Sequence, residues 1–174
     1  MIDGIGSPSD SPAYKAAMKV IYPVAYKIKF LSKAEGRDYV VPPLEGLWWA
    51  DDMNDFRNGN RDKWKWTMMI RQPEWITEEQ FKEAIKITTE KKPELKDLLP
   101  KLRFESFEEG KSAQIMHIGP YSEEAPTIER LHQFIKEQGG IFNGHELKHH
   151  EIYIGDPRRG NPANLRTVIR QPYN

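Results

Sequence analysis

The chain has 174 residues, of which 38% are hydrophobic, a size and composition typical of one compact domain or of two fused half-domains. Lysine plus arginine and aspartate plus glutamate both total 26, so the net charge is zero and no basic surplus points to nucleic acid or to an anionic membrane. The absence of cysteine excludes disulfides, thiolate metal sites and a cysteine nucleophile.

Residues 1–6 lack the cationic and long apolar regions of a secretory signal, and no apolar run approaches the roughly 20 residues of a membrane span. We therefore expect a cytoplasmic protein that binds neither a membrane nor nucleic acid directly. A protein partner and the oligomeric state stay open.

The first elements in chain order are a strand at residues 2–4, a helix at about 12–31 and two strands at 46–51 and 63–71. Apolar residues recur at the helical period within the helix, which predicts one buried face: Ala13, Ala17, Val20, Ile21, Val24 and Ile28. Pro23 is expected to kink this helix.

A linker helix is predicted at about 77–92. Thr77 and Gln80 match a capping box, and Pro93 ends the helical pattern. The linker helix separates two similar halves of the chain.

In the second half, the sequence predicts a strand that ends at Gly119, a helix at about 123–138, and strands at 151–156 and 165–170. The tetrapeptide Ile-Arg-Gln-Pro closes both halves, at 70–73 and again at 169–172. The order β-α-β-β therefore occurs twice, which predicts an α+β fold of two repeats related by a pseudo-twofold axis. We expect one domain over 1–174, with repeat one at about 1–73 and repeat two at about 103–174.

Strand alternation assigns the residues near the end of the chain to two faces. His149, Glu151 and Tyr153 share one face, whereas Ile152 and Ile154 lie on the other. Since the isoleucine face is apolar, we expect it to pack beneath the helices. That arrangement turns Glu151 and Tyr153 toward the opposite side of the sheet.

Aligning Asp51 with Asp156 relates the two halves. It places Gly46 against Glu151 and Trp48 against Tyr153. One half then offers a carboxylate and a phenol, and the other an aromatic wall with space beside it.

All five tryptophans lie between residues 48 and 75: Trp48, Trp49, Trp64, Trp66 and Trp75. They could fill the core, since tryptophan is highly buried on average. Four of them lie on the two strands that would line a groove, however, so we expect at least two to line a pocket. Flat apolar walls with a few polar groups are typical of a small-molecule site, and a carboxylate among aromatic rings favours planar or cationic ligands.

Four segments of this sequence resemble the stand-alone members of the GyrI-like small-molecule-binding domains: 45–51, 64–73, 117–121 and 149–157. The resemblance covers nearly the whole chain. It implies two β-α-β-β (SH2-like) units that form an antiparallel sheet, with helices on one face and a ligand groove on the other. Relatives often carry an additional stretch before the segment that begins here at Met1.

The resemblance also implies a function. Relatives include drug-sensing domains of multidrug transcription activators, which bind lipophilic cations against a buried glutamate matched here by Glu151, and an inhibitor of DNA gyrase. The branch with paired tryptophans resembles hydrolases that open the cyclopropane of DNA-alkylating cyclopropanoid compounds. We expect such a detoxifying hydrolase, and the alternative is a non-catalytic module that binds or sequesters drugs or acts on a protein such as gyrase.

Ring opening of an electrophilic cyclopropane needs an activated water and a hydrogen bond at the carbonyl that gains charge. A carboxyl group in apolar surroundings has a raised pKa and can accept a proton at neutral pH. We therefore expect Glu151 to act as the base and Tyr153 or Tyr121 to hold the water or the oxyanion. The alternative role for Glu151 is that of a counter-ion. The expected ligand-binding residues are Trp48, Trp49, Trp64, Trp66 and Tyr121.

No cofactor is expected, and no glycine-rich phosphate loop or nucleophile elbow occurs. His149 and His150 resemble metal ligands, but neighbouring strand residues point to opposite faces. At most His149 and Glu151 converge, so a metal site would need His145 or His117 as a further ligand. The sequence therefore favours no metal site.

Overall fold

The computed structural model describes residues 1–155 and 161–174. The strands are β1 (Ile2–Ile5), β2 (Leu44–Trp49), β3 (Lys65–Ile70), β4 (Ser112–Ile118), β5 (His149–Tyr153) and β6 (Arg166–Pro172). The helices are α1 (Pro12–Ala34), α2 (Asn54–Arg57), α3 (Glu78–Lys91) and α4 (Ala125–Glu137). The predicted elements are present, although β5 ends at Tyr153, and Asp156, where the sequence predicts its end, lies outside the described residues.

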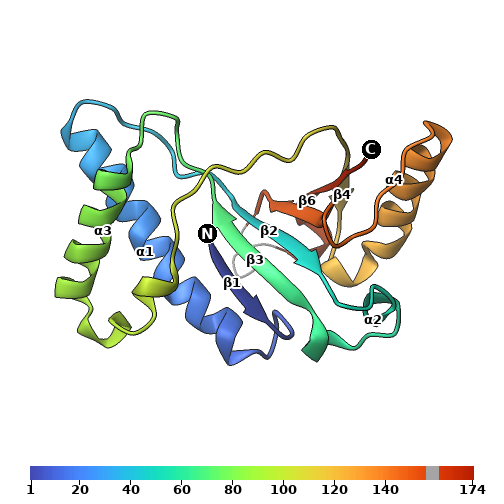
Figure 1. Ribbon diagram of the computed structural model, residues 1–174, viewed down its shortest axis with the longest axis horizontal. Helices are drawn as coiled ribbons and strands as arrows, with labels where there is room; N and C mark the ends of the chain where they lie inside the picture. Colours follow the sequence, from blue (N-terminus) through green and yellow to red (C-terminus); the bar gives the residue numbers. More distant parts are fainter. Residues whose placement is uncertain (156–160) are drawn as a thin grey trace.

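The strands form one antiparallel sheet in the order β1-β3-β2-β5-β6-β4 (Figure 1). Each half of the chain supplies three neighbouring strands, and β2 and β5 meet in the middle. The predicted α+β fold with β-α-β-β in each half is confirmed. The bounds given above for the two repeats stay a prediction.

Gly46 and Glu151 face each other at the centre of the β2–β5 ladder. Leu44 pairs with Tyr153 on one side of them, and Trp48 pairs with His149 on the other. A rotation that exchanges β2 and β5 therefore exchanges Trp48 with Tyr153. The pseudo-twofold axis passes through the Gly46–Glu151 pair.

Two helices begin at residues suited to that position. The Ser11 side chain accepts from the amide of Tyr14 at the start of α1, which continues through Pro23 to Ala34. Thr77 and Gln80 form the predicted capping box of α3, with both reciprocal hydrogen bonds present.

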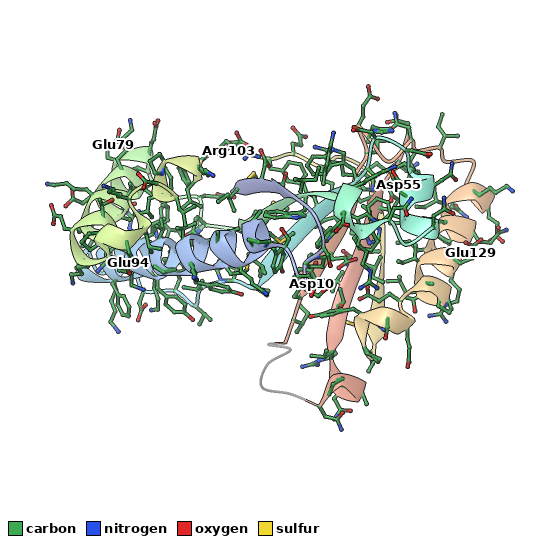
Figure 2. All side chains as sticks on the ribbon, turned by 90° about the horizontal axis from the view of Figure 1, so that it is seen from below. Asp10, Asp55, Glu79, Glu94, Arg103 and Glu129 are labelled. Carbon is green, nitrogen blue, oxygen red and sulfur yellow. The ribbon has the colours of Figure 1, made fainter. Side chains whose placement is uncertain are left out.

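Helices α1 and α4 cover the same face of the sheet. α1 packs on β1 and β3, and its buried residues form one cluster with Trp66 and Met68. α4 packs Leu131 and Ile135 on Ile169 of β6. Figure 1 shows α1 and α3 at one end of the molecule and α4 at the other. Figure 2 shows the same separation, with Glu79 and Glu94 at the α3 end and Glu129 on α4.

One prediction about β5 is wrong. Glu151 pairs with Ile169, and directly paired residues share a face, so Glu151 faces the side that α4 covers. The isoleucine face of β5 therefore lies on the side away from the helices, where Ile154 is 41% exposed. Alternation identifies the residues that share a face, but it does not say which face the helices cover.

The opposite face of the sheet carries the connector, residues 102–111, which leads into β4. Its Glu109 reaches the buried His150 of β5. Among the described residues, no helix has both the length and the apolar character needed to cross a membrane.

Candidate functional site

Trp48 and Tyr153 meet above Gly46, at the centre of the sheet. The Trp48 indole Nε1 donates to the Tyr153 phenol oxygen at 2.9 Å. A Cβ atom at Gly46 would lie 2.6 Å from Cε of Met68, 2.8 Å from Nε1 of Trp48 and 3.1 Å from the Tyr153 oxygen. The contact between the two symmetry-related side chains therefore requires glycine at position 46.

Glu151 stands beside this pair. His149 Nε2 donates to Glu151 Oε1 at 3.0 Å, and both side chains are 14% exposed. The pKa of the Tyr153 phenol is raised well above its usual range, first by burial and then by the charge of Glu151, while the Trp48 indole opposes the shift. Tyr153 is therefore a neutral hydrogen-bond donor near pH 7, held between an indole and a carboxylate.

The starts of α1 and α4 close over the same place. The ring of Tyr121, in the turn before α4, lies edge-on to the ring of Tyr153 with centroids 5.7 Å apart. Burial raises the pKa of Tyr14 in the first turn of α1, and Tyr121 and Glu151 add to the shift. Tyr121 thus contacts Tyr153, and Tyr14 lies close enough to Glu151 for its charge to act on the phenol.

A second carboxyl group completes the arrangement. Glu124, the residue before α4, is buried, and its Oε1 has no hydrogen-bond partner among the described residues. Burial, followed by the charge of Glu151, raises the pKa of Glu124 to about 8, whereas the Thr167 hydroxyl opposes the shift. Glu124 is therefore mostly protonated at neutral pH.

We call these groups the central site, and they are Tyr14, Trp48, Tyr121, Glu124, His149, Glu151 and Tyr153. The structure brings together Glu151, Tyr153, Trp48 and Tyr121 from the residues that the sequence selects. Sequence reasoning missed Tyr14 and Glu124. A tyrosine in the first turn of a helix and a glutamate just before a helix give no signal of their own, because both are ordinary there.

The remaining tryptophans lie at different distances from the central site. Trp64 stacks on Phe56 at 4.6 Å and meets the Trp48 ring edge-on at 6.1 Å, so it extends the aromatic wall. Trp66 is 0% exposed and donates to the backbone oxygen of Gly6, which makes it part of the core beneath Tyr14. Trp49 lies on the other face of β2, where the Lys148 ammonium is 3.9 Å from its ring centroid. Trp49 is thus not brought to the site.

Two cavities occur elsewhere in the molecule. One of about 400 Å³ lies between α1 and α3, beside Tyr22 and Thr88, and one of about 140 Å³ lies beneath the connector, beside Phe107. Neither is lined by a residue of the central site. The central site is the candidate functional site because it brings two carboxyl groups and several phenols together.

His149 and Glu151 do converge, as the sequence allows. His117 is held elsewhere, with Nδ1 3.1 Å from the Thr127 hydroxyl and Nε2 3.2 Å from the Pro120 carbonyl oxygen. Within residues 1–155 and 161–174, no three histidine, aspartate or glutamate side chains are grouped as metal ligands.

Solved structures of Listeria innocua proteins are similar to this chain. An uncharacterized conserved protein from Listeria innocua is 38% identical, with a TM-score of 0.89, over 99% of this chain and 85% of that one. A hydrolase from Listeria innocua and a hydrolase encoded by lin2189 from the same organism are each 39% identical, with TM-scores of 0.83 and the same coverage. No curated protein matches.

The family comparison covers the whole chain. The model of the GyrI-like small molecule binding domain matches residues 1–174. The same sheet, with helices over one face, occurs in solved structures at 38% and 39% identity. The chain therefore belongs to the family of GyrI-like small-molecule-binding domains.

Proposed function

We propose that this protein is a cofactor-free hydrolase that binds a planar, electrophilic small molecule at the central site and adds water to it. The substrate class is the cyclopropanoid DNA-alkylating compounds, and the biological outcome is detoxification. The observation that carries this proposal is the position of Glu151, which accepts from His149 and lies next to Tyr153. The Tyr153 side chain in turn contacts Trp48 and Tyr121. Two similar structures from Listeria innocua are named hydrolases, which supports the reaction type.

The proposed chemistry uses groups already in contact. Glu151 takes a proton from water while the water oxygen attacks the cyclopropane carbon. The ring bond breaks, and its electron pair moves into the conjugated carbonyl, whose oxygen becomes negative. Tyr153 is a neutral phenol, so it can donate a hydrogen bond to the water or to that oxygen. The aromatic rings bind the flat body of the substrate.

The second candidate is binding without turnover. Carboxyl groups beside aromatic rings also suit a lipophilic cation, because the ring faces and the carboxylate both attract positive charge. In that case Glu151 is a counter-ion, and the protein sequesters drugs. A gyrase-inhibitor-like interaction with a protein is a third role, and it would need none of these side chains.

Turnover separates the candidates. We expect the protein to convert a cyclopropanoid compound into a product heavier by one water, detected by mass spectrometry. Glu151→Gln keeps the shape but cannot take the proton, so turnover should fall by about 100-fold or more, with little change in affinity for a neutral ligand. Glu129→Gln, on the exposed surface of α4, is the matched control and should retain the parent rate (Figure 2).

The opposite result is equally clear. If the parent protein gives no product, but a planar cation quenches its tryptophan fluorescence and Glu151→Gln weakens that binding, the protein is a binding module. Hydrolysis by Glu151→Gln at the parent rate would show that another group is the base.

A further inference from the structure

Glu124 is a buried acid whose side chain does not cap the helix that it precedes. A polar side chain at a helix N-terminus ordinarily accepts from the amides of the first turn. The Glu124 side chain makes no such bond, and only its backbone carbonyl accepts from the amides of Thr127 and Ile128, at 2.9 Å each. The residue is 6% exposed, and its Oε1 has no hydrogen-bond partner in the part of the chain that the structure describes. Helix capping therefore does not account for this carboxyl group.

The surroundings of Glu124 come from three strands. Thr167 of β6 lies beside it, Glu151 of β5 acts on it through its charge, and Tyr153 is the direct neighbour of Thr167 in the sheet. His117 of β4 lies beneath the start of α4. Its Nδ1 is close to the Thr127 hydroxyl, and its Nε2 is close to the Pro120 carbonyl oxygen. Tyr121 approaches from the preceding turn. No positively charged group is among the causes that set the pKa of Glu124.

The two carboxyl groups have different environments. Glu151 accepts a hydrogen bond from His149 and lies next to the Tyr153 phenol. Burial and the negative charge of Glu151 both disfavour the ionised form of Glu124 and together raise its pKa to about 8. Two neighbouring carboxyl groups whose environments differ in this way divide into an acid and a base.

We propose that Glu124 and Glu151 form an acid–base pair, in which Glu124 delivers a proton to the substrate while Glu151 removes one from water. This inference rests on the hydrolase function proposed above. Water oxygen bonds to the ring carbon, the ring bond breaks, and Glu124 protonates the carbonyl oxygen that receives the electron pair. The proton taken by Glu151 then returns to Glu124, so the net change is the addition of one water. The substrate must therefore carry a conjugated carbonyl within reach of Glu124.

The pair can be tested without any substrate. In protein labelled with ¹³C at the glutamate carboxyl carbons, NMR should show one carboxyl group that titrates near pH 8, and Glu124→Gln should remove that signal. The exposed neighbour supplies the control, since Glu123→Gln should leave the signal in place. Glu151→Gln should shift the titration to lower pH, because it removes the charge that opposes ionisation. If Glu124 titrates in the usual range of a glutamate, or if Glu151→Gln does not change its titration, the proposed acid–base pair is refuted.

Kinetics with a cyclopropanoid compound test the proton delivery. The kcat of the parent should fall as pH rises through the titration of Glu124, and Glu124→Gln should lower kcat by about 100-fold and lose this dependence while KM stays close to the parent value. Glu124→Asp keeps an acidic proton and should recover part of the rate, whereas Glu123→Gln should match the parent. Full activity in Glu124→Gln overturns the proposal.

The two tests fail separately. A parent protein with the raised titration but no turnover refutes the hydrolase function and, with it, proton delivery to a substrate. A parent protein with turnover but an ordinary titration for Glu124 leaves the hydrolase intact and refutes the acid–base pair.

Discussion

At Gly46 the backbone of β2 leaves room for two large side chains to meet. The indole of Trp48 and the phenol of Tyr153 lean toward each other across this residue, and their hydrogen bond of 2.9 Å forms above it. Tyr153 in turn lies next to Glu151. The absence of a side chain at one position thus orients a phenol at another.

We expect Gly46→Ala to destabilise the protein by about 1–3 kcal/mol, the usual range for overpacking a filled site. The added methyl group would lie 2.6 Å from Met68 and 2.8 Å from the Trp48 nitrogen, so both side chains would have to move. Urea denaturation measures the loss, and turnover should fall as Tyr153 is displaced. Gly155→Ala is the control, because among the described residues its methyl group meets no atom closer than Leu165, at 3.9 Å. Equal stability in the two variants would contradict this account.

At the scale of elements, the connector is attached to the sheet through a buried histidine. His150 Nδ1 donates to Glu109 of the connector, and its Nε2 donates to Glu45 of β2, both at 2.9 Å. Glu109 also accepts from Arg170 of β6 at 2.9 Å. Both ring nitrogens of His150 are donors in this arrangement, so the ring is the charged imidazolium.

This network makes stability depend on pH. Burial alone would lower the pKa of His150, but hydrogen bonds and charge from Glu109 and Glu45 outweigh it, and the net shift is upward from 6.5. A folded-state pKa above the unfolded value means that the stabilisation is complete below pH 6.5 and is lost as pH rises through the folded value. The connector should therefore loosen as the pH rises through the raised pKa of His150.

We predict that the free energy of unfolding of the parent falls as pH rises above 6.5, and that His150→Gln removes part of this slope. Urea denaturation at a series of pH values measures it. Glu124 adds a slope of the same sign, since its pKa is also raised, so each variant is compared with the parent at every pH. The exposed His145 supplies the control variant His145→Gln. An identical slope in the parent and His150→Gln would refute the role of this network.

At the scale of the whole molecule, the pseudo-symmetric halves have unequal cores. The buried cluster around α1 and α3 is large and extends through β1, β2 and β3. The cluster around α4 consists of Ala113, Leu131, Ile135, Ile169 and Tyr173. The edge strand β4 also has an exposed side, where Ile118 is 65% exposed. The halves share the sheet, but the second buries less apolar surface.

We expect local opening to begin in the second half, because the stability of a segment follows the apolar surface it buries. Amides of the edge strand β4 should exchange with deuterium faster than those of the other edge strand, β1, which packs against the larger core. Hydrogen exchange followed by mass spectrometry measures the difference. Equal rates at both edges would mean that the sheet opens as one unit.

The sequence contains much of the fold, because helical and strand periods depend on local spacing. The apolar stripe of α1, the capping box of α3 and the repeated order β-α-β-β are all visible without a structure. The pairing of Gly46 with Glu151 also follows from aligning the halves. The alignment given by the repeated tetrapeptide, however, differs by two residues from the alignment of the two halves in the sheet. Gly46 pairs with Met68 and Glu151 with Ile169, whereas the tetrapeptide aligns Ile169 with Ile70.

The sequence by itself therefore determined which elements form and which residues of a strand share a face. A shift of two residues keeps every side chain on its face, so the sequence pattern is the same before and after it. Only the tertiary structure decided which face the helices cover, and that choice placed Glu151 beneath α4 instead of on the open side. It also brought Tyr14 and Glu124 close enough to Glu151 for its charge to act on them. Folding sets the distances between residues that are far apart in the chain.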